Sequence, residues 1–326
     1  MTGHDTSSGE WGAFAPRPSD AQVLATIAGV VEGSTAYMAG PYSNQFRLSI
    51  TEALSTQLFA ALDRLEPAPL TSENLDALYP LAEKLGLASL SGVYQLFRQK
   101  PGEERVLTYV GKADQPLPKR LGDHLKKLSG RAGISVSEMS FRCLFVEEDL
   151  SSVSPEKMLI KRHLETGTIV WNNRGFGPND PGSERDTTRN SENHWDLEFP
   201  IDLARKVQGL VPGQQPLKVL LKAIKQGLPF NFRFAQGLGP LGEKVVTVTD
   251  TEMTAEEAFQ FVGAHLTGKW QVSALVGWVI MYEDDHKVYP SAFRYYRPDG
   301  VIVDQKPITR KPKKGENPDE VGEGEN

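Results

Sequence analysis

The amino-acid sequence predicts an α+β fold, in which a helical arm precedes a small antiparallel sheet flanked by helices and a second α+β domain follows. Three observations predict this fold. Apolar residues recur at helical spacing before residue 90, and the spacing then changes to that of β-strands. Turn residues separate the first two strand-like runs, which favours a hairpin. The chain has 326 residues, enough for two cores, since a domain usually holds roughly 100–200 residues.

The N-terminal part is predicted to contain an arm and a helical segment. Residues 1–45 are rich in Ser, Gly, Pro and Ala, so we expect them to be loosely ordered. Residues 46–90 are expected to be helical, because apolar side chains recur every three or four positions over 49–65 and again over 75–85. The polar residues 71–74 are typical of a helix start.

Residues 91–207 are predicted to form the first compact domain. Its elements are expected in the order strand, strand, helix, strand, helix, at 92–97, 105–110, 117–128, 141–146 and from Ser154 onward. Ser154 is suited to cap the last helix, and Pro155 and Glu156 are suited to its first turn. The polar stretch 171–195 is expected to be irregular.

A second α+β domain is expected at 216–305, after a linker at 208–215 that contains Gly and Pro. Its predicted elements are, in order, a helix, a strand, a helix and two strands, at 216–225, 244–248, 254–266, 272–282 and 288–296. Aromatic residues alternate with Arg at 230–234 and 293–297, as on nucleic-acid surfaces, but this pattern is more often a half-buried strand. The sequence assigns no role to this domain. Residues 306–326 are basic and then acidic, and are predicted to be a disordered charged tail.

The composition excludes some classes of protein. No run approaches the roughly 18 consecutive apolar residues of a membrane span, so no membrane partner is expected. The polar N-terminus lacks the features of a secretory signal. Cys143 is the single cysteine, so it has no disulfide partner within the chain and is expected to be a core thiol. We therefore expect a cytoplasmic protein.

The formal net charge of −6 conceals a local basic excess. Residues 92–185 carry 15 Lys and Arg against 12 Asp and Glu, and the basic side chains concentrate within 112–131. A local cationic face neutralises phosphates even in an acidic protein, because exposed charges beyond a Debye length of about 10 Å are largely screened. A solvated helix face has the same composition, and on charge alone it is the commoner explanation.

One set of chemically capable residues occurs in the first domain. It contains two Tyr, an Arg four positions before a His, a Glu at a capped helix start and a late Asn, namely Tyr94, Tyr109, Arg120, His124, Glu156 and Asn172. Each residue alone has an ordinary structural explanation. Hydrolysis of a phosphodiester needs a proton acceptor, a positive group for the phosphate and help for the leaving oxygen. The set contains a side chain suited to each task.

The order of these residues resembles the GIY-YIG nucleases. In that superfamily two signature tripeptides lie on a hairpin, followed by a helix with Arg-x-x-x-His, a metal-binding Glu and an Asn. Here the tripeptides are Gly92-Val93-Tyr94 and Tyr109-Val110-Gly111, with Val in place of Ile in both. The resemblance covers about 92–186. Within it, the segment 171–185, Trp-Asn-Asn-Arg-Gly-Phe-Gly-Pro-Asn-Asp-Pro-Gly-Ser-Glu-Arg, is similar to one in GIY-YIG type II restriction endonucleases that cut a GC-rich palindrome.

The resemblance implies a metal-dependent DNA endonuclease, a hydrolase of restriction-modification and anti-phage defence. Glu156 would bind Mg²⁺, and Mn²⁺ would substitute for it. Arg120 would stabilise the charge on the phosphate, and His124 would accept a proton from Tyr94.

Other side chains would position the substrate. Tyr109, Lys112 and Asn172 would orient the phosphate, the water and the metal shell, and whether Asn172 or Asn173 is the site residue stays open. Six basic side chains are expected to contact DNA, namely Lys112, Lys119, Lys127, Arg131, Arg174 and Arg185.

Double-stranded DNA is the expected partner. The motif set occurs once, whereas a palindrome presents two scissile phosphates, so a homodimer on DNA is expected. A restriction enzyme would also be accompanied by a cognate methyltransferase. Two alternatives remain: a structure-specific DNA repair nuclease, and a DNA-binding or scaffold protein without catalytic activity. The recognition sequence, and the choice between modified and unmodified DNA, are not encoded in recognisable motifs.

Overall fold

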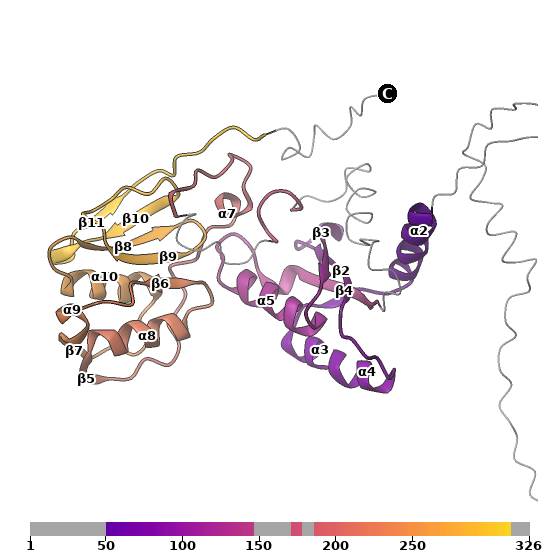
Figure 1. Ribbon diagram of the computed structural model, residues 1–326, viewed down its shortest axis with the longest axis horizontal. Helices are drawn as coiled ribbons and strands as arrows, with labels where there is room; N and C mark the ends of the chain where they lie inside the picture. The colour runs from indigo at the N-terminus through magenta and orange to yellow at the C-terminus, as the bar shows by residue number, and fades with distance from the viewer. Residues whose placement is uncertain (1–49, 147–170, 178–185, 314–326) are drawn as a thin grey trace, which may run out of the picture. The chain divides into compact units, whose positions relative to one another are not determined.

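Helices and largely antiparallel sheets make up the computed structural model (Figure 1), which confirms the predicted α+β class at the level of mixed helix and sheet. The structure describes residues 50–146, 171–177 and 186–313. The chain divides into a unit that ends at Leu54 and a unit that begins at Ser55, and the second unit holds both sheets discussed below. Glu156, Arg185 and the predicted helix after Ser154 lie outside the described residues.

The first sheet has four strands in the order β1-β4-β2-β3. Its strands are β1 (Ala68–Pro69), β2 (Gly92–Arg98), β3 (Val106–Ala113) and β4 (Met139–Phe145), all paired antiparallel. The predicted β2–β3 hairpin is confirmed. Strand β1 was not predicted, because two residues are too few for a recognisable strand pattern within a segment of helical spacing.

Helices lie before the hairpin and after it. They are α2 (Ile50–Asp63), α3 (Ser72–Asp76), α4 (Leu78–Lys84) and α5 (Leu117–Ser129). Phe59 and Leu62 of α2 pack against Val93 and Val110 of the hairpin. Helix α3 begins where the sequence predicted a helix start, with the Thr71 hydroxyl accepting a hydrogen bond from the backbone of residue 74 at 3.3 Å.

The opposite face of the hairpin meets helix α5. Side chains alternate between the two faces of a strand, so Tyr94 and Tyr109, next to Val93 and Val110 in sequence, face the other way. They pack with the buried leucines of α5, namely Leu117, Leu121 and Leu128. Helix α5 therefore has the predicted leucine spacing. The face that these leucines bury determines which polar side chains of the helix meet the two tyrosines.

The second sheet has five strands in the order β11-β10-β8-β9-β6. They are β6 (Phe232–Phe234), β8 (Trp270–Leu275), β9 (Val279–Glu283), β10 (Ala292–Tyr296) and β11 (Ile302–Asp304). Helices α8 (Leu217–Gly227) and α10 (Ala255–His265) pack on one face of this sheet (Figure 1) and share its main core. Short elements complete the fold: η1 (Val136–Glu138), α7 (Trp195–Glu198), β5 (Gly213–Pro216), α9 (Pro240–Glu243), β7 (Val245–Val248) and η3 (Pro298–Gly300).

Some residues near the predicted domain boundary pack in the core of the second sheet. Ile201, Leu203 and Val207, which the sequence placed in the first domain, are buried in the core of the second. The predicted linker 208–215 contributes a buried Leu210 and most of β5, which pairs with β7. The Gly and Pro residues of this segment precede or belong to a paired strand. Gly and Pro also occur in flexible linkers, so these residues alone do not distinguish the two structures.

Three further differences concern the second domain and the tail. The strand expected at 272–282 is the hairpin β8–β9, whose turn residues Val276-Gly277-Trp278 are too apolar to signal a turn. The aromatic and Arg-containing runs form β6 and β10, the half-buried strands that the pattern more often indicates. Residues 306–313 belong to the expected disordered tail, yet Arg310 pairs with Ser191 through the backbone.

Two expectations from the sequence concerned membrane-spanning segments and the single cysteine. In the part of the chain that the structure describes, no helix is both long enough and apolar enough to cross a bilayer. Cys143 of β4 is a free cysteine packed at the margin of the first core, and burial raises the pKa of its thiol to about 12.

Candidate active site

Four of the predicted site residues meet on the α5 face of the hairpin. Tyr94 comes from β2, Tyr109 from β3, and Arg120 and His124 from α5. The ring centroids of the two tyrosines are 6.1 Å apart, and the His124 ring centroid lies 5.5 Å from each. The sequence spacing therefore placed these side chains correctly, since strand alternation and helix periodicity direct them to one point.

The close approach of the two phenols depends on Gly111. This residue pairs with Tyr94 across the hairpin. A Cβ atom at Gly111 would overlap the Tyr94 hydroxyl and would lie 2.8 Å from the Tyr109 ring. The glycine of the second tripeptide is thus required because the Tyr94 ring lies across its Cα, and any side chain there would displace that ring.

The Tyr94 hydroxyl lies within hydrogen-bond distance of side chains from helix α5. The Arg120 Nε–H donates to the Tyr94 hydroxyl at 3.2 Å, and that hydroxyl lies 2.7 Å from Nε2 of His124. A guanidinium has only donors, so the phenol oxygen accepts from Arg120, and its own hydrogen is available to a second partner, His124 or the neighbouring Tyr109. Donation to His124 requires the tautomer with an unprotonated Nε2.

The electrostatics agree with a neutral pair. Burial, with the positive charges of Arg120 and Lys127 adding to it, lowers the pKa of His124 well below its usual value. Burial and the neighbouring Tyr109 raise the pKa of Tyr94, against the opposing effect of Arg120. At neutral pH the site therefore holds a protonated phenol next to a neutral imidazole.

The loop 171–177 covers the outer edge of β3 and is fixed there by Asn172. Val110 N–H donates to Oδ1 of Asn172 at 3.0 Å, and Nδ2 of Asn172 donates to the Val110 carbonyl at 2.9 Å. Strand β3 is an edge strand, so Asn172 takes the place of a neighbouring strand. Its amide holds the loop, and its expected role toward the metal shell stays a prediction.

Phe176 is a site residue that the sequence did not single out. Its ring stacks on His124 with centroids 4.8 Å apart and planes 14° apart, and it meets Tyr109 edge-on at 5.0 Å. Arg120 Nη2 donates to the next carbonyl, that of Gly177, at 2.9 Å. An isolated Phe in a polar stretch was the only signal of this role, since the loop is irregular and distant in sequence from His124.

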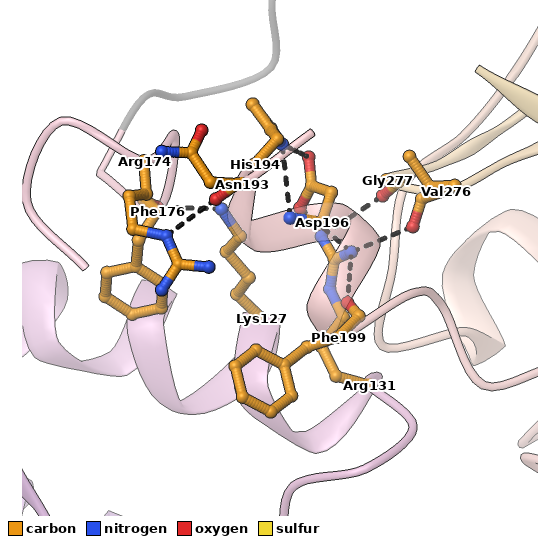
Figure 2. A network of polar contacts seen from close by, with 10 residues as sticks. All are labelled: Lys127, Arg131, Arg174, Phe176, Asn193, His194, Asp196, Phe199, Val276 and Gly277. Atoms are coloured by element: carbon orange, nitrogen blue, oxygen red, sulfur yellow. Dashed lines mark hydrogen bonds and ion pairs between the residues drawn. The ribbon is translucent and has the colours of Figure 1, made fainter. Parts of the chain in front are cut away.

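Three of the side chains that were predicted to contact DNA bind other groups of the protein. The half-buried Lys127 donates to the Phe176 carbonyl at 2.7 Å. Arg131 is buried, with Nη1 3.0 Å from Oδ1 of Asp196 (Figure 2). Arg174 donates to the Asn193 carbonyl at 2.6 Å and to Glu198 at 2.7 Å.

The helical spacing explains these contacts within the protein, and contact of the three side chains with DNA stays a prediction. Arg120, His124 and Lys127 share one stripe of α5, and Arg131 follows the end of the helix. Residues of the loop and of α7 bind the basic side chains, so these do not form an open cationic face. Of the other predicted DNA contacts, Lys119 is exposed, Lys112 pairs with Asp114 at 3.2 Å and Arg185 lies outside the described residues.

Asp196 is the anion next to Lys127 and Arg131. Burial alone would raise its pKa, but Arg131 and Lys127 hold the pKa below its usual value. Arg131 also donates to the carbonyls of Val276 at 3.1 Å and Gly277 at 3.3 Å, in the β8–β9 turn (Figure 2). The residue that follows the end of α5 is therefore bonded to the β8–β9 turn.

Metal ligands are not concentrated in the described residues. Within 50–146, 171–177 and 186–313, no group of three or more His, Cys, Asp or Glu side chains could hold a metal ion. The Tyr94 cluster consists of phenols, an imidazole and a guanidinium, whereas Mg²⁺ prefers carboxylate oxygens. The described side chains do not by themselves fit Mg²⁺, and the expected ligand Glu156 lies outside them.

Comparison with models of known protein families gives no match, and no curated protein matches the chain. The functional inference therefore depends on the geometry of the cluster and on the sequence pattern that predicted it.

Proposed function

We propose that this protein is a DNA endonuclease of the GIY-YIG type, which hydrolyses phosphodiester bonds in double-stranded DNA as a sequence-specific restriction enzyme. The observation that carries the proposal is the hydrogen-bonded set of Tyr94, His124 and Arg120. It supports the proposal because a proton acceptor and a fixed positive charge meet at one phenol oxygen. The 171–185 segment supports the restriction class.

The geometry suits a relay of two protons. As water attacks phosphorus and the bond from phosphorus to the leaving sugar oxygen breaks, the water proton passes to the Tyr94 oxygen while the Tyr94 hydrogen passes to Nε2 of His124, and the leaving oxygen takes a proton from solvent. The phenol is regenerated, and the imidazole becomes positively charged. A bound phosphate would offset the positive charge of Arg120, so the proton affinity of His124 would be higher in the DNA complex than in the free protein.

Arg120 would bind the phosphate that reaches Tyr94. Its half-buried guanidinium is oriented by the Tyr94 hydroxyl and the Gly177 carbonyl. A charge that is already oriented stabilises the developing negative charge without reorganisation. Glu156 would hold Mg²⁺ or Mn²⁺, which when bound would stabilise charge on the phosphate oxygens.

Plasmid cleavage tests the proposal. Purified protein with Mg²⁺ should convert methylated or unmethylated plasmid into discrete fragments, and the Tyr94→Phe variant should do so at least about 100-fold more slowly. Cleavage limited to forks or flaps would favour the repair nuclease. The absence of cleavage on all these substrates, with Mg²⁺ and with Mn²⁺, would favour the catalytically inactive DNA-binding protein.

A further inference from the structure

The groups that contact the Lys127 ammonium directly are a backbone carbonyl and two aromatic rings. Lys127 lies one turn after His124 on α5, and its Nζ donates to the Phe176 carbonyl at 2.7 Å. The same Nζ lies 5.1 Å from the Phe176 ring centroid and 4.7 Å from that of Trp195, both of which are buried. An ammonium is attracted to aromatic faces at such distances, and more strongly when water is excluded.

Burial disfavours the charged form of the Lys127 side chain. Burial lowers the pKa of Lys127 to about 8, Asp196 opposes this, and Arg131 and Arg120 add to it. Lys127 is therefore still largely charged at neutral pH, although a neutral side chain of the same length would avoid the cost of desolvation. A charged group kept in such surroundings suggests a role beyond packing.

That role concerns the loop above His124. Arg120 and Lys127 lie two turns apart on α5 and bind the consecutive carbonyls of Gly177 and Phe176. The Phe176 ring between them covers one face of the His124 imidazole. Figure 2 shows Lys127 reaching from the helix to the Phe176 backbone. The two side chains together fix the loop at the residue that contacts the imidazole.

We propose that Lys127 is a positioning residue of the hydrolytic site, which holds Phe176 against His124 and so keeps Nε2 directed at Tyr94. The proposal rests on the proposed nuclease function. It replaces the expectation that Lys127 contacts DNA, and the two roles affect different measurable quantities. A positioning residue affects the rate on bound DNA, whereas a phosphate contact affects the affinity and its salt dependence.

The test compares Lys127→Met with Lys126→Met. Methionine keeps the unbranched stem and removes the ammonium, and Lys126 is the adjacent, exposed lysine of the same helix. Three quantities are measured: the single-turnover rate on saturating DNA, the dissociation constant over a range of salt concentrations, and the ¹H shifts of the His124 ring. Comparison with His124→Gln assigns these shifts among the six histidines.

Lys127→Met should lower the single-turnover rate about 10-fold or more, within the range that misplacement of catalytic groups produces. Its dissociation constant and salt dependence should equal those of the wild type, and its His124 shifts should lose the displacement caused by the stacked ring. Lys126→Met should leave the rate and the shifts unchanged. Phe176→Leu should lower the rate similarly, and the double variant should be no slower than the slower single variant.

Two results would overturn the proposal. The first is an unchanged rate on saturating DNA together with weaker binding and a salt slope reduced by about one, which marks a phosphate contact. The second is a set of unchanged His124 shifts in a folded Lys127→Met protein, and this result counts even if the wild type cuts no DNA. Failure of the nuclease proposal is thus distinguishable from failure of the positioning role.

Discussion

The Tyr94 hydroxyl lies 2.7 Å from Nε2 of His124, although the two residues are 30 positions apart on a strand and a helix. Arg120 donates to the same hydroxyl. The three side chains share one hydrogen-bonded oxygen, so the effects of replacing them are expected to be coupled.

Tyr94→Phe and His124→Ala should each slow cleavage by about 10²–10⁴-fold, the range typical of general acid–base groups. The double variant should be about as slow as the slower single variant, because one proton path is lost in each case. Single-turnover rates on saturating DNA measure this coupling. Fully multiplicative losses would show that the two residues act in separate steps.

A second prediction concerns stability and pH. Burial lowers the pKa of His124 in the folded protein, while the unfolded chain keeps the usual value near 6.5. Below that pH the unfolded state binds more protons, so the stabilisation is complete above pH 6.5 and is lost as the pH falls, by up to about 1.4 kcal/mol per pH unit.

Urea denaturation of the wild type and of His124→Gln at several values between about pH 5 and 7.5 measures this loss. Burial also lowers the pKa of His194, but His194 is present in both proteins, so their difference isolates His124. The free energy of unfolding should fall less steeply with acid in His124→Gln. Equal slopes would contradict a lowered pKa at His124.

The fold and the centre of the site were largely predictable because both follow local periodicity. Alternation along β2 and β3 faces Tyr94 and Tyr109 to the same side, and four-residue spacing on α5 adds Arg120 and His124. The same reasoning gave the wrong environment for Lys127 and Arg131. Whether a helical stripe meets solvent depends on what covers it, and here the cover comes from residues distant in sequence.

The packing of the residues near the predicted domain boundary did not follow from the sequence, for a related reason. Residues 201–207 have no regular pattern of their own, and only tertiary contacts assign them to the second core. Turn signals likewise failed at the β8–β9 turn, since close packing against Asp196 selected Gly277 within an apolar sequence. Patterns of single elements do not contain this information.

A third prediction concerns the proposed metal ligand. Glu156→Gln should abolish cleavage with Mg²⁺ and leave DNA binding nearly unchanged, because it removes one charge and almost no volume. Cleavage assays and gel-shift titrations with the same duplex measure both effects, and wild-type protein treated with a chelator should lose cleavage in the same way. Full Mg²⁺-dependent cleavage by Glu156→Gln would exclude this residue as the ligand.

A fourth prediction concerns assembly on DNA. One chain supplies one Tyr94 cluster, whereas cleavage of both strands of a palindrome needs two clusters related by a two-fold axis. Sedimentation velocity should therefore detect two protein chains on one cognate duplex, and one chain on a duplex with a single half-site. A monomer that cuts both strands in one binding event would contradict the prediction.

The last prediction concerns the contact between α5 and the second domain. Arg131 bonds to the carbonyls of Val276 and Gly277, and Asp196 fills the space above Gly277. A Cβ atom at Gly277 would lie 2.8 Å from Oδ2 and 3.3 Å from Cγ of Asp196. Asp196 is buried and paired, so it cannot move away without weakening its bond to Arg131. Gly277→Ala should therefore destabilise the protein by about 1–3 kcal/mol, as overpacking of a core does.

Gly237→Ala is the matched control, because a Cβ atom at Gly237 meets nothing within 4 Å. Its free energy of unfolding should stay within about 0.5 kcal/mol of the wild type, as is usual for surface substitutions. Both values come from urea denaturation at the same pH. If Gly277→Ala were as stable as Gly237→Ala, the turn would have room to shift, and the Arg131 bonds would not hold it against α5. If it is less stable and also slower on saturating DNA, then the second domain contributes to the position of the helix that carries Arg120 and His124.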